Sequence, residues 1–240
     1  MKLEGLDGKV GIVTGAAQGI GFAIAQSLAA NGMKVALLDV RREQVEIAAR
    51  QIPAAIGVHV DVTRRESVDA AFADVERLLG PPDVLVNNAG IIAWKSFDEI
   101  DERDWDKMMD VNAKGVFLCC RAAYSMMRSR GKCCIVNITS SAGKKATTAC
   151  PHYAASKAAV LNLTLSLAAD LAPYGVRVNG VAPALIETDM FAGKDVAKRS
   201  PVGRMGRTSE VADAVAFLCS DNAAFITGEI LDVNGGFLMD

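Results

Sequence analysis

Short apolar segments rich in valine and isoleucine alternate with longer amphipathic segments along the chain. After Val62, for example, Val68, Phe72 and Val75 recur at steps of three and four residues with charged residues between them, which is the period of a helix. Near-continuous apolar strands that alternate with helices are typical of a parallel sheet covered on both faces. The predicted strands are 10–14, 34–39, 56–60, 83–87, 134–138, 176–181 and 229–233. The predicted helices are 19–31, 42–51, 67–79, 101–130, 153–172 and 209–219.

This alternation continues without a break. No linker rich in proline, glycine or serine, no shift in composition and no internal repeat interrupts it. We therefore expect residues 1–240 to form a single α/β domain of the Rossmann type, with a doubly wound, seven-stranded parallel sheet and helices on both faces. The ligand site of such a sheet lies outside the carboxyl ends of its strands.

Charge and composition narrow the classes of partner. The 26 Lys and Arg residues nearly balance 28 Asp and Glu residues, which argues against a dedicated nucleic-acid binder. Although 51% of the residues are hydrophobic, every apolar run ends well short of the ~18 residues of a membrane span. The six cysteines show no CxxC spacing, there are only two histidines, and the first residues show no signal-peptide pattern. We expect packed, reduced thiols, a cytoplasmic location and no metal site.

A glycine-rich turn follows the first predicted strand and leads directly into helical sequence. Glycines let backbone N–H groups approach a diphosphate closely, and the diphosphate then also meets the positive end of the helix dipole. Because the spacing is G-x-x-x-G-x-G, the turn taken alone is also compatible with a plain strand-to-helix connection. The residues of this turn that we expect to bind a dinucleotide are Thr14, Gly15, Gln18, Gly19, Ile20 and Gly21.

An acidic residue ends the second predicted strand. Asp39 lies 18 residues beyond Gly21, where a carboxylate can accept hydrogen bonds from both hydroxyls of an adenosine ribose and would repel a 2′-phosphate. We therefore expect NAD rather than NADP, although Arg41 is close enough in sequence to turn toward the ribose and offset the carboxylate. Asp61 and Val62 end the third strand, where an adenine ring would be bracketed, but an ordinary strand-end aspartate explains the spacing equally well.

Four polar residues are candidates for the chemistry. Tyr153 and Lys157 lie one helical turn apart, where a positive charge favours tyrosinate and lowers the phenol pKa toward the range of a general acid/base. Ser140 ends the fifth strand and so belongs to the same edge of the sheet. Asn112 is a poor helix former inside otherwise helical sequence. A surface Tyr–Lys pair, a strand-end hydroxyl and a solvent-facing asparagine are the plainer explanations.

In combination these motifs resemble the short-chain dehydrogenase/reductase family. The match runs the length of the chain and is similar in particular to the bacterial 3-oxoacyl-acyl-carrier-protein reductase-like group and its sugar, polyol and secondary-alcohol dehydrogenase relatives. The residues that carry the resemblance, in this order and spacing, are the glycine turn 14–21, Asn87-Asn88-Ala89-Gly90, Asn112, Ser140, Tyr153 with Lys157, and Pro183-Ala184-Leu185-Ile186-Glu187-Thr188.

The resemblance implies a role for each matching position. Tyr153 would exchange a proton with the substrate oxygen, Ser140 would orient that oxygen, and Lys157 would lower the tyrosine pKa and hold the nicotinamide ribose. Asn112 would keep its helix kinked around a water that links Lys157 to solvent. The cofactor would carry out the hydride chemistry. The further cofactor-binding positions implied are Asn88, Ala89, Gly90, Pro183, Ile186 and Thr188.

Substrate choice in such a site rests on the loops at the strand ends. The family usually has Pro-Gly where this chain has Pro183-Ala184, and the added methyl group can shift the loop that follows. Only 12 residues separate Thr188 from Pro201, a short lid that favours a compact substrate or an open site. The candidate wall residues, each of which local packing also explains, are Trp94, Ala142, the stretch 144–152 that ends in His152, Leu185 and Met190.

The expected function is hydride transfer between NAD(H) and a small secondary alcohol, polyol or sugar and its ketone. The alternative within the family is an NADPH-dependent 3-oxoacyl-acyl-carrier-protein reductase. The resemblance puts the basic carrier-docking positions of that group beside the site, near Gly131 and Tyr174, which are not basic here, although Arg128 and Arg130 are close. A non-catalytic NAD-sensing scaffold is the alternative from another class, and it would be expected to have lost the tyrosine or the lysine.

The helix predicted after Tyr153 carries a face of small residues. Ala155, Ala158 and Ala159, with Leu163, allow another helix to pack closely. The resemblance implies that this helix and the preceding one pair across a two-fold axis. We therefore expect a homotetramer that acts on a small molecule, with no nucleic-acid or membrane partner.

Overall fold

The computed structural model of the chain describes residues 3–191 and 199–239, and within them seven strands form one sheet. The strands are β1 Val10–Thr14, β2 Lys34–Asp39, β3 Ala55–His59, β4 Val84–Asn87, β5 Cys134–Ile138, β6 Arg177–Pro183 and β7 Ile230–Val233. The main helices are α1 Gly19–Ala30, α2 Arg42–Ala49, α3 Arg65–Leu79, α4 Glu102–Met109, α5 Gly115–Arg130, α6 Pro151–Leu171 and α7 Thr208–Cys219.

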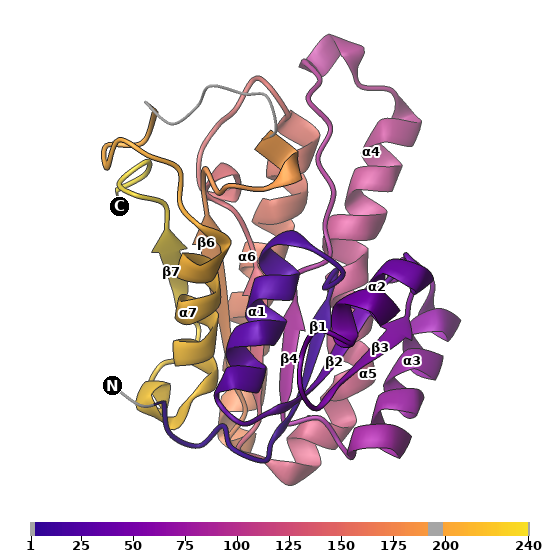
Figure 1. Cartoon of the computed structure of the whole chain (residues 1–240). Coiled ribbons are helices and arrows are strands. Elements are labelled where there is room, and N and C mark those ends of the chain that lie inside the picture. The colour runs from indigo at the N-terminus through magenta and orange to yellow at the C-terminus, as the bar shows by residue number, and fades with distance from the viewer. Residues whose placement is uncertain (1–2, 192–198, 240) are drawn as a thin grey trace.

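All neighbouring strands are parallel, in the order β3-β2-β1-β4-β5-β6-β7. The chain therefore winds outward from β1 in one direction and from β4 in the other, with helices on both sides of the sheet (Figure 1). This arrangement confirms the predicted doubly wound, Rossmann-type α/β fold. The carboxyl ends of the strands meet at one edge, and the switch point lies between β1 and β4.

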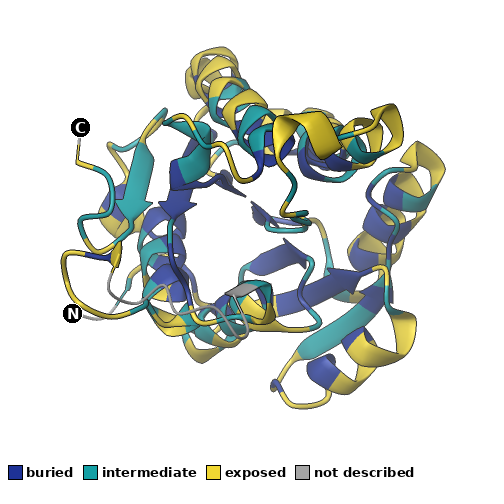
Figure 2. Ribbon diagram, turned by 90° about the horizontal axis from the view of Figure 1, so that it is seen from above, coloured by how far each residue is buried: buried dark blue, intermediate teal, exposed yellow. Residues whose placement is uncertain are grey.

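Alternate residues of each strand supply the cores on the two sides of the sheet. In β2, Val35 and Leu37 pack with α1, α2 and α7, whereas Ala36 and Leu38 pack with α3, α5 and α6. Because both faces are covered, the strands read as unbroken apolar runs. Figure 2 shows the same arrangement as buried strands surrounded by helices whose outer sides are exposed.

The helix predicted over 101–130 is not one continuous α-helix. Between α4 and α5 the chain forms a π-helical segment, Asp110–Lys114, with one extra residue in the turn. Asn112 sits in this segment with its side chain fully buried, and its amide makes both a donor and an acceptor contact with the backbone of Ile91. The wider turn directs that side chain inward, which a regular helix with a solvent-facing asparagine would not do.

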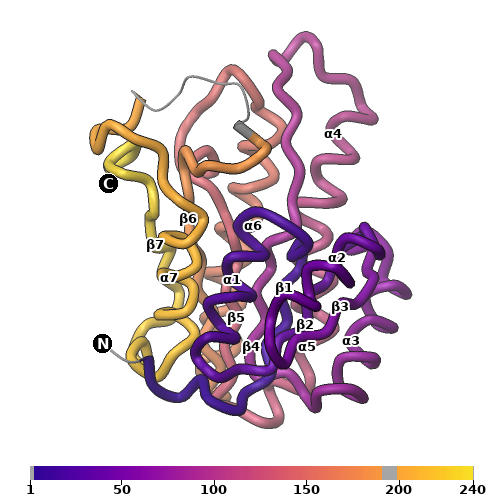
Figure 3. The backbone as a smooth tube through the Cα atoms, in the orientation of Figure 1, coloured from indigo at the N-terminus to yellow at the C-terminus, as the bar shows by residue number. Residues whose placement is uncertain are grey.

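Both ends of the described chain are attached to the fold on the side of α7 and β7 (Figure 3). Near the start, the backbone carbonyl of Glu4 accepts a hydrogen bond from the N–H of Asp221, just after α7. Near the other end, Ser200 donates a hydrogen bond to the carbonyl of Gly235. The segment after β7 is therefore held against the residues that precede α7.

The cysteines are packed in the interior of the fold. All six cysteines are buried, and burial raises the pKa of the Cys119 thiol and raises that of Cys120 to about 12, so both are held as thiols. Among the described residues, no helix is both long enough and apolar enough to cross a membrane.

Candidate active site

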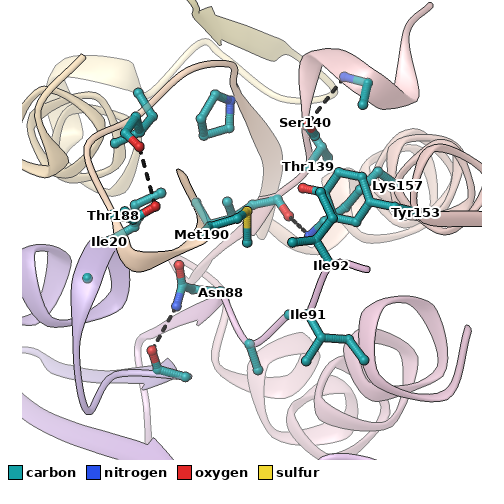
Figure 4. A pocket seen from close by; sticks show the side chains of 18 of the residues that line it. Ile20, Asn88, Ile91, Ile92, Thr139, Ser140, Tyr153, Lys157, Thr188 and Met190 are labelled. Carbon is teal, nitrogen blue, oxygen red and sulfur yellow. Dashed lines mark hydrogen bonds between the residues drawn. The ribbon is translucent and has the colours of Figure 1, made fainter. Parts of the chain in front are cut away.

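A cavity of about 1430 Å³ opens at the carboxyl edge of the sheet. It is lined by residues that follow β1, β2, β4, β5 and β6, as expected for a doubly wound sheet. In Figure 4, Ser140, Tyr153 and Lys157 lie together on one side, with Ile20 and Thr188 across from them. The volume exceeds the ~300–1,000 Å³ of a typical small-ligand pocket, so it suits a long cofactor together with a substrate.

The glycine turn after β1 has three different local environments. Gly15 has a φ of 63°, and a Cβ there would lie 2.7 Å from the Cα of Ala89. A Cβ on Gly21 would lie 2.4 Å from the side-chain nitrogen of Asn88, so this glycine permits close packing of α1. Gly19 is different, because a Cβ there would meet only the Thr188 methyl group, at 3.8 Å. Both residues line the cavity at the N-terminus of α1, where a side chain on Gly19 would narrow the space beside Thr188.

The turn after β4 is tied to the end of β1. The side chain of Asn88 donates hydrogen bonds to the backbone carbonyls of Thr14 and Gly15, at 2.9 and 3.0 Å. The Thr14 hydroxyl oxygen in turn accepts from the backbone N–H groups of Asn88 and Ala89, both at 3.0 Å. Asn88, Ala89 and Gly90 line the cavity, whereas Thr14 and Gly21 do not. The last two therefore shape the turn rather than face a ligand.

Asp39 lies at the cavity wall with its carboxylate largely occupied. It accepts a hydrogen bond from the backbone N–H of Ala17 at 3.2 Å and forms an ion pair with Arg41 at 3.1 Å. Arg41 also donates to the side chain of Gln18 at 2.7 Å, and Gln18 donates to Asp189 across the cavity at 3.1 Å. The hydrogen bond between the Asp39 carboxylate and the Arg41 guanidinium raises the pKa of Arg41. Arg41, which could have turned toward the ribose and offset the negative charge of Asp39, is thus held beside that carboxylate.

Asp61 and Val62 both line the cavity where β3 ends. One carboxylate oxygen of Asp61 accepts hydrogen bonds from the N–H and the hydroxyl of Thr63, at 3.0 and 2.7 Å. The backbone N–H of Asp61 donates to the Ser67 hydroxyl in the first turn of α3. This aspartate therefore organises the start of α3 as well as bordering the cavity, and both explanations of it fit the geometry.

Tyr153, Ser140 and Lys157 converge on the cavity wall. The backbone N–H of Ala142 donates to the Ser140 hydroxyl oxygen at 3.1 Å, which leaves the Ser140 proton available to an acceptor on the cavity side. Lys157 donates to the backbone carbonyl of Ile138 at 2.9 Å, and its nitrogen lies 5.9 Å from the centroid of the Tyr153 ring. Helix α6 thus places the side chains of Tyr153 and Lys157 beside Ser140, which lies just after β5.

The direction of the tyrosine pKa differs from the expectation. Burial raises the pKa of Tyr153 to about 12, more than the hydrogen bond from Ser140 lowers it. Burial also lowers the pKa of Lys157 to about 8. The expected lowering of the phenol pKa by Lys157 is therefore wrong for the chain alone, because loss of water outweighs a cation that lies 5.9 Å from the ring centroid.

Asn112 does not line the cavity, although it lies directly behind it. Its side chain bonds the N–H and carbonyl of Ile91 at 2.8 and 2.9 Å and donates to Ser156 at 3.0 Å. A Cβ on Gly90 would lie 3.3 Å from the Asn112 oxygen and 3.4 Å from the Lys157 nitrogen. Asn112 is therefore a positioning residue that holds the loop after β4 beside Lys157.

His152 is not a wall of the cavity. It is fully buried, and among the described residues neither ring nitrogen has a hydrogen-bond partner. Residues adjacent in a helix point about 100° apart, so when Tyr153 faces the cavity His152 turns away from it, toward α4 and the charges of Asp104 and Lys95. Burial lowers the pKa of His152, which keeps the imidazole neutral.

Of the predicted stretch 144–152, residues 145–150 line the cavity, whereas Lys144 and Pro151, like His152, do not. The other predicted wall and loop residues do line it. Thr188 also donates to the carbonyl of Ile186 at 3.3 Å, so the loop after Pro183-Ala184 keeps both residues at the wall. Of the predicted lid, residues 192–198 lie outside the described residues. The residues in question are Trp94, Ala142, Pro183, Leu185, Ile186, Thr188 and Met190.

Arg199 and Phe237 are cavity residues that the sequence did not single out. Lys145, within the predicted wall stretch, Arg199 and Phe237 line the cavity together. The only local signal was the Asn234-Gly235-Gly236 turn that precedes Phe237, where Gly235 and Gly236 have φ of 59° and 80°. Such a turn redirects the chain after β7, but the sequence did not indicate where it leads.

The basic residues near the predicted carrier-docking positions lie away from the cavity. Arg130 pairs with Asp83 at 2.7 Å, immediately before β4 begins, and the Arg128 guanidinium lies 4.1 Å from the centroid of the Tyr174 ring. Both belong to the amino-end edge of the sheet, because the C-terminal end of α5 is opposite to the carboxyl ends of the strands. The expectation that these positions lie beside the site is therefore wrong within one chain.

Comparison with known proteins shows similarity over nearly the whole chain. Residues 15–238 match the family model described as enoyl-(acyl carrier protein) reductase. The chain is 37% identical to an NAD-dependent glycerol dehydrogenase of Listeria innocua, over 95% of this chain and 93% of that protein. It is 40% identical to the cis-4-hydroxycyclohexanecarboxylate dehydrogenase of Sinomonas cyclohexanicum, over 95% and 96%.

A solved structure extends the similarity to three dimensions. The 3-ketoacyl-(acyl-carrier-protein) reductase of Brucella melitensis, complexed with NADH, superimposes with a TM-score of 0.95 at 33% identity, covering 98% of this chain and all of that one. The matches confirm the resemblance, the fold and the NAD(P) cofactor. The chain belongs to the short-chain dehydrogenase/reductase family and is an NAD(P)-dependent oxidoreductase that acts on CH–OH or keto groups.

Proposed function

We propose that this enzyme transfers a hydride between NAD(H) and a small secondary alcohol or its ketone, with Tyr153 as the general acid/base. The observation that carries the proposal is the grouping of Ser140, Tyr153 and Lys157 at the cavity wall, with Lys157 one helical turn from the tyrosine. A substrate oxygen that contacts both hydroxyls has a proton donor and a polarising group on the same side.

The residues around the cavity have distinct roles toward the cofactor. When bound, NAD supplies the hydride donor or acceptor. Gly19 and Thr188 border its diphosphate, and Asp39 accepts hydrogen bonds from the adenosine ribose. Lys157 holds the nicotinamide ribose. The preference for NAD follows from a buried carboxylate that already neutralises Arg41 and leaves little positive charge for a 2′-phosphate.

The protonation states favour particular steps for each side chain. With a pKa of about 12, Tyr153 carries its proton at neutral pH and can donate it to a carbonyl oxygen during reduction. Ser140 donates a hydrogen bond that stabilises the tyrosinate left behind. Lys157, still mostly protonated at neutral pH, stabilises the same anion. Asn112 keeps the loop after β4 in place for these steps.

A 3-oxoacyl-acyl-carrier-protein reductase that uses NADPH is the second candidate. The similarity to the Brucella structure favours it, because that protein is a 3-ketoacyl-(acyl-carrier-protein) reductase. Against it, Arg128 and Arg130 are held by Tyr174 and Asp83 at the opposite edge of the sheet from the cavity. These two arginines therefore offer an acidic carrier protein no docking surface beside the site of the same subunit.

We also propose a homotetramer. Ala158 and Ala159 are exposed on α6, and Ala155 and Leu163 are half-buried along the same helix. Apolar side chains extend this face, since Phe117 of α5 is 49% exposed. An apolar face spread over two adjacent helices is suited to pairing with a second copy across a two-fold axis.

The test is a substrate panel with each coenzyme. Small secondary alcohols, polyols, sugars and the matching ketones are mixed with NAD(H) or NADP(H), and the absorbance of reduced nicotinamide is followed. A 3-oxoacyl thioester is included for the second candidate. We expect turnover of a small secondary alcohol or ketone with NAD(H). Turnover confined to the thioester with NADPH would replace the first proposal with the second.

A further inference from the structure

Two cations converge on one aromatic ring at the far end of the cavity from Asp39. The Lys145 ammonium lies 3.4 Å from the centroid of the Phe237 ring, and the Arg199 guanidinium carbon lies 5.6 Å from it. Lys145 follows β5 and Phe237 follows β7, whereas Asp39 follows β2. Since β2 and β7 lie on opposite sides of the sheet centre, this cluster belongs to the substrate end rather than the adenosine end.

Neighbouring contacts fix the backbone on either side of the cluster. Lys144 pairs with Asp232 of β7 at 2.5 Å, which holds the start of the loop that carries Lys145. Ser200 donates to the carbonyl of Gly235 at 3.0 Å, which holds the residue next to Arg199 against the turn that carries Phe237. Two long-range contacts therefore bring three distant segments together at this position.

The two charges of the cluster have no carboxylate partner in the part of the chain that the structure describes. Within residues 3–191 and 199–239, neither Lys145 nor Arg199 forms an ion pair with a carboxylate. Of the other cations at the wall, Arg41 pairs with Asp39 and Lys157 donates to the carbonyl of Ile138. Two like charges that share one ring repel each other, and an anion bound between them would remove that repulsion.

We propose that Lys145 and Arg199 form a subsite for a compact oxyanion, such as a carboxylate, on the substrate itself. The inference rests on the proposed function and gives it a substrate class, that of hydroxy acids and oxo acids whose charged group lies away from the reacting carbon. The ring of Phe237 supplies an apolar surface for the carbon skeleton between the two ends. Ser140 and Tyr153 take the oxygen that reacts, and the two cations take the acid group.

Binding tests the subsite without turnover. Cyclohexanecarboxylate, cyclohexyl phosphate and the neutral cyclohexanecarboxamide are titrated by calorimetry into the enzyme saturated with NADH. We expect the carboxylate to bind about tenfold or more tightly than the amide, and its affinity to fall as salt is added. Equal affinity of the acid and the amide overturns the proposal. A phosphate ester that binds while the carboxylate does not assigns the subsite to phosphorylated substrates.

Charge-neutral variants identify the residues. Lys145→Gln with Arg199→Gln should abolish the preference for the carboxylate, and Lys145→Arg should retain it. The matched control is Lys34→Gln, which removes one positive charge at the exposed start of β2, on the opposite edge of the sheet. A double variant that keeps the anion preference, or one that weakens binding of NADH instead, overturns the assignment.

The two levels of the proposal fail in different ways. A neutral secondary alcohol such as cyclohexanol should be turned over at a similar rate by wild type and the double variant, while kcat/KM for 4-hydroxycyclohexanecarboxylate falls about tenfold or more. If no alcohol or ketone reacts with either coenzyme, the proposed function fails, and the calorimetric result still decides the subsite. If cyclohexanol and 4-hydroxycyclohexanecarboxylate react equally well, and the double variant behaves as wild type with each, the proposed function stands and the subsite is refuted.

Discussion

Lys157 donates its hydrogen bond to the backbone carbonyl of Ile138, and its nitrogen lies 5.9 Å from the centroid of the Tyr153 ring. The ammonium is therefore fixed by the strand from which Ser140 emerges rather than by the tyrosine. Both groups are buried, and burial moves the pKa of Tyr153 up to about 12 and that of Lys157 down to about 8. Four predictions follow from this arrangement and from its surroundings.

Replacement of the acid/base should abolish turnover without loss of the cofactor. In Tyr153→Phe the phenol proton is lost and the ring is kept, so kcat should fall by about 10²- to 10⁴-fold while the Kd for NADH, measured by fluorescence, changes little. Tyr124→Phe, on the exposed side of α5, is the matched control and should keep full activity. Full activity of the Tyr153 variant would remove the tyrosine from the mechanism.

Replacement of the buried cation should stabilise the protein while inactivating it. Lys157→Met removes the cost of burying an ammonium and leaves the Ile138 carbonyl without its donor, for a net gain of about 2 kcal/mol in the free energy of unfolding at pH 7. Because the folded-state pKa of about 8 lies below that of a lysine in the unfolded chain, the cost is fully present below pH 8 and is lost as pH rises toward the unfolded value.

The stability gain should therefore shrink between pH 8 and about 10. Urea unfolding of wild type and Lys157→Met at pH 7 and pH 10 measures it. Tyr153 is present in both proteins, so its own contribution largely cancels in the comparison. A gain that grows with pH, or a variant less stable than wild type at pH 7, contradicts the assignment of a buried, charged lysine.

Removal of the ribose carboxylate should shift the coenzyme preference. Asp39→Asn abolishes the negative charge that now holds Arg41, so the guanidinium becomes available to a 2′-phosphate. We expect the ratio of kcat/KM for NADP over NAD to rise about tenfold or more. The double change Asp39→Asn with Arg41→Gln should lose most of this rise. An unchanged ratio in the single variant would sink the ribose assignment.

A bulky charge on the exposed face of α6 should disrupt assembly. Wild-type protein is expected at the mass of four chains by light scattering, and Ala159→Arg should shift it to smaller species because the side chain occupies the space of a neighbouring helix. Ala30→Arg, at the exposed end of α1, serves as the control and should keep the wild-type mass. A monomeric wild type at micromolar concentration refutes the tetramer.

The elements could be predicted where the signal is local. The bounds of β1, β2 and β5 are those expected, because each is a continuous apolar run between turn or charged residues. Periodicity did not predict the π-helical segment, because the segment depends on the bonds between Asn112 and Ile91, which are 21 residues apart. Only the family resemblance implied a kink at Asn112. Sequence periodicity shows that a helix is present, but not that one turn must widen to admit a distant loop.

The site divides in the same way. Tyr153 and Lys157 could be paired from their spacing, since one helix carries both. The side-chain directions of His152 and Arg41 could not be predicted. His152 packs toward the neighbouring helix α4, and Arg41 is held by the carboxylate of Asp39, two residues earlier. The Phe237 cluster was beyond sequence reasoning altogether, since residues 145, 199 and 237 meet only through tertiary contacts.

The bonds from Asn112 to Ile91 also have a mechanical consequence. The amide links the loop after β4 to the segment from which α5 begins, and α5 carries the exposed Phe117 on its outer side. A displacement of α5 would therefore act on the backbone of the loop after β4, beside Lys157. In the proposed tetramer, a second chain packed on the outer side of α5 would in this way influence the alignment of the proton-transfer groups.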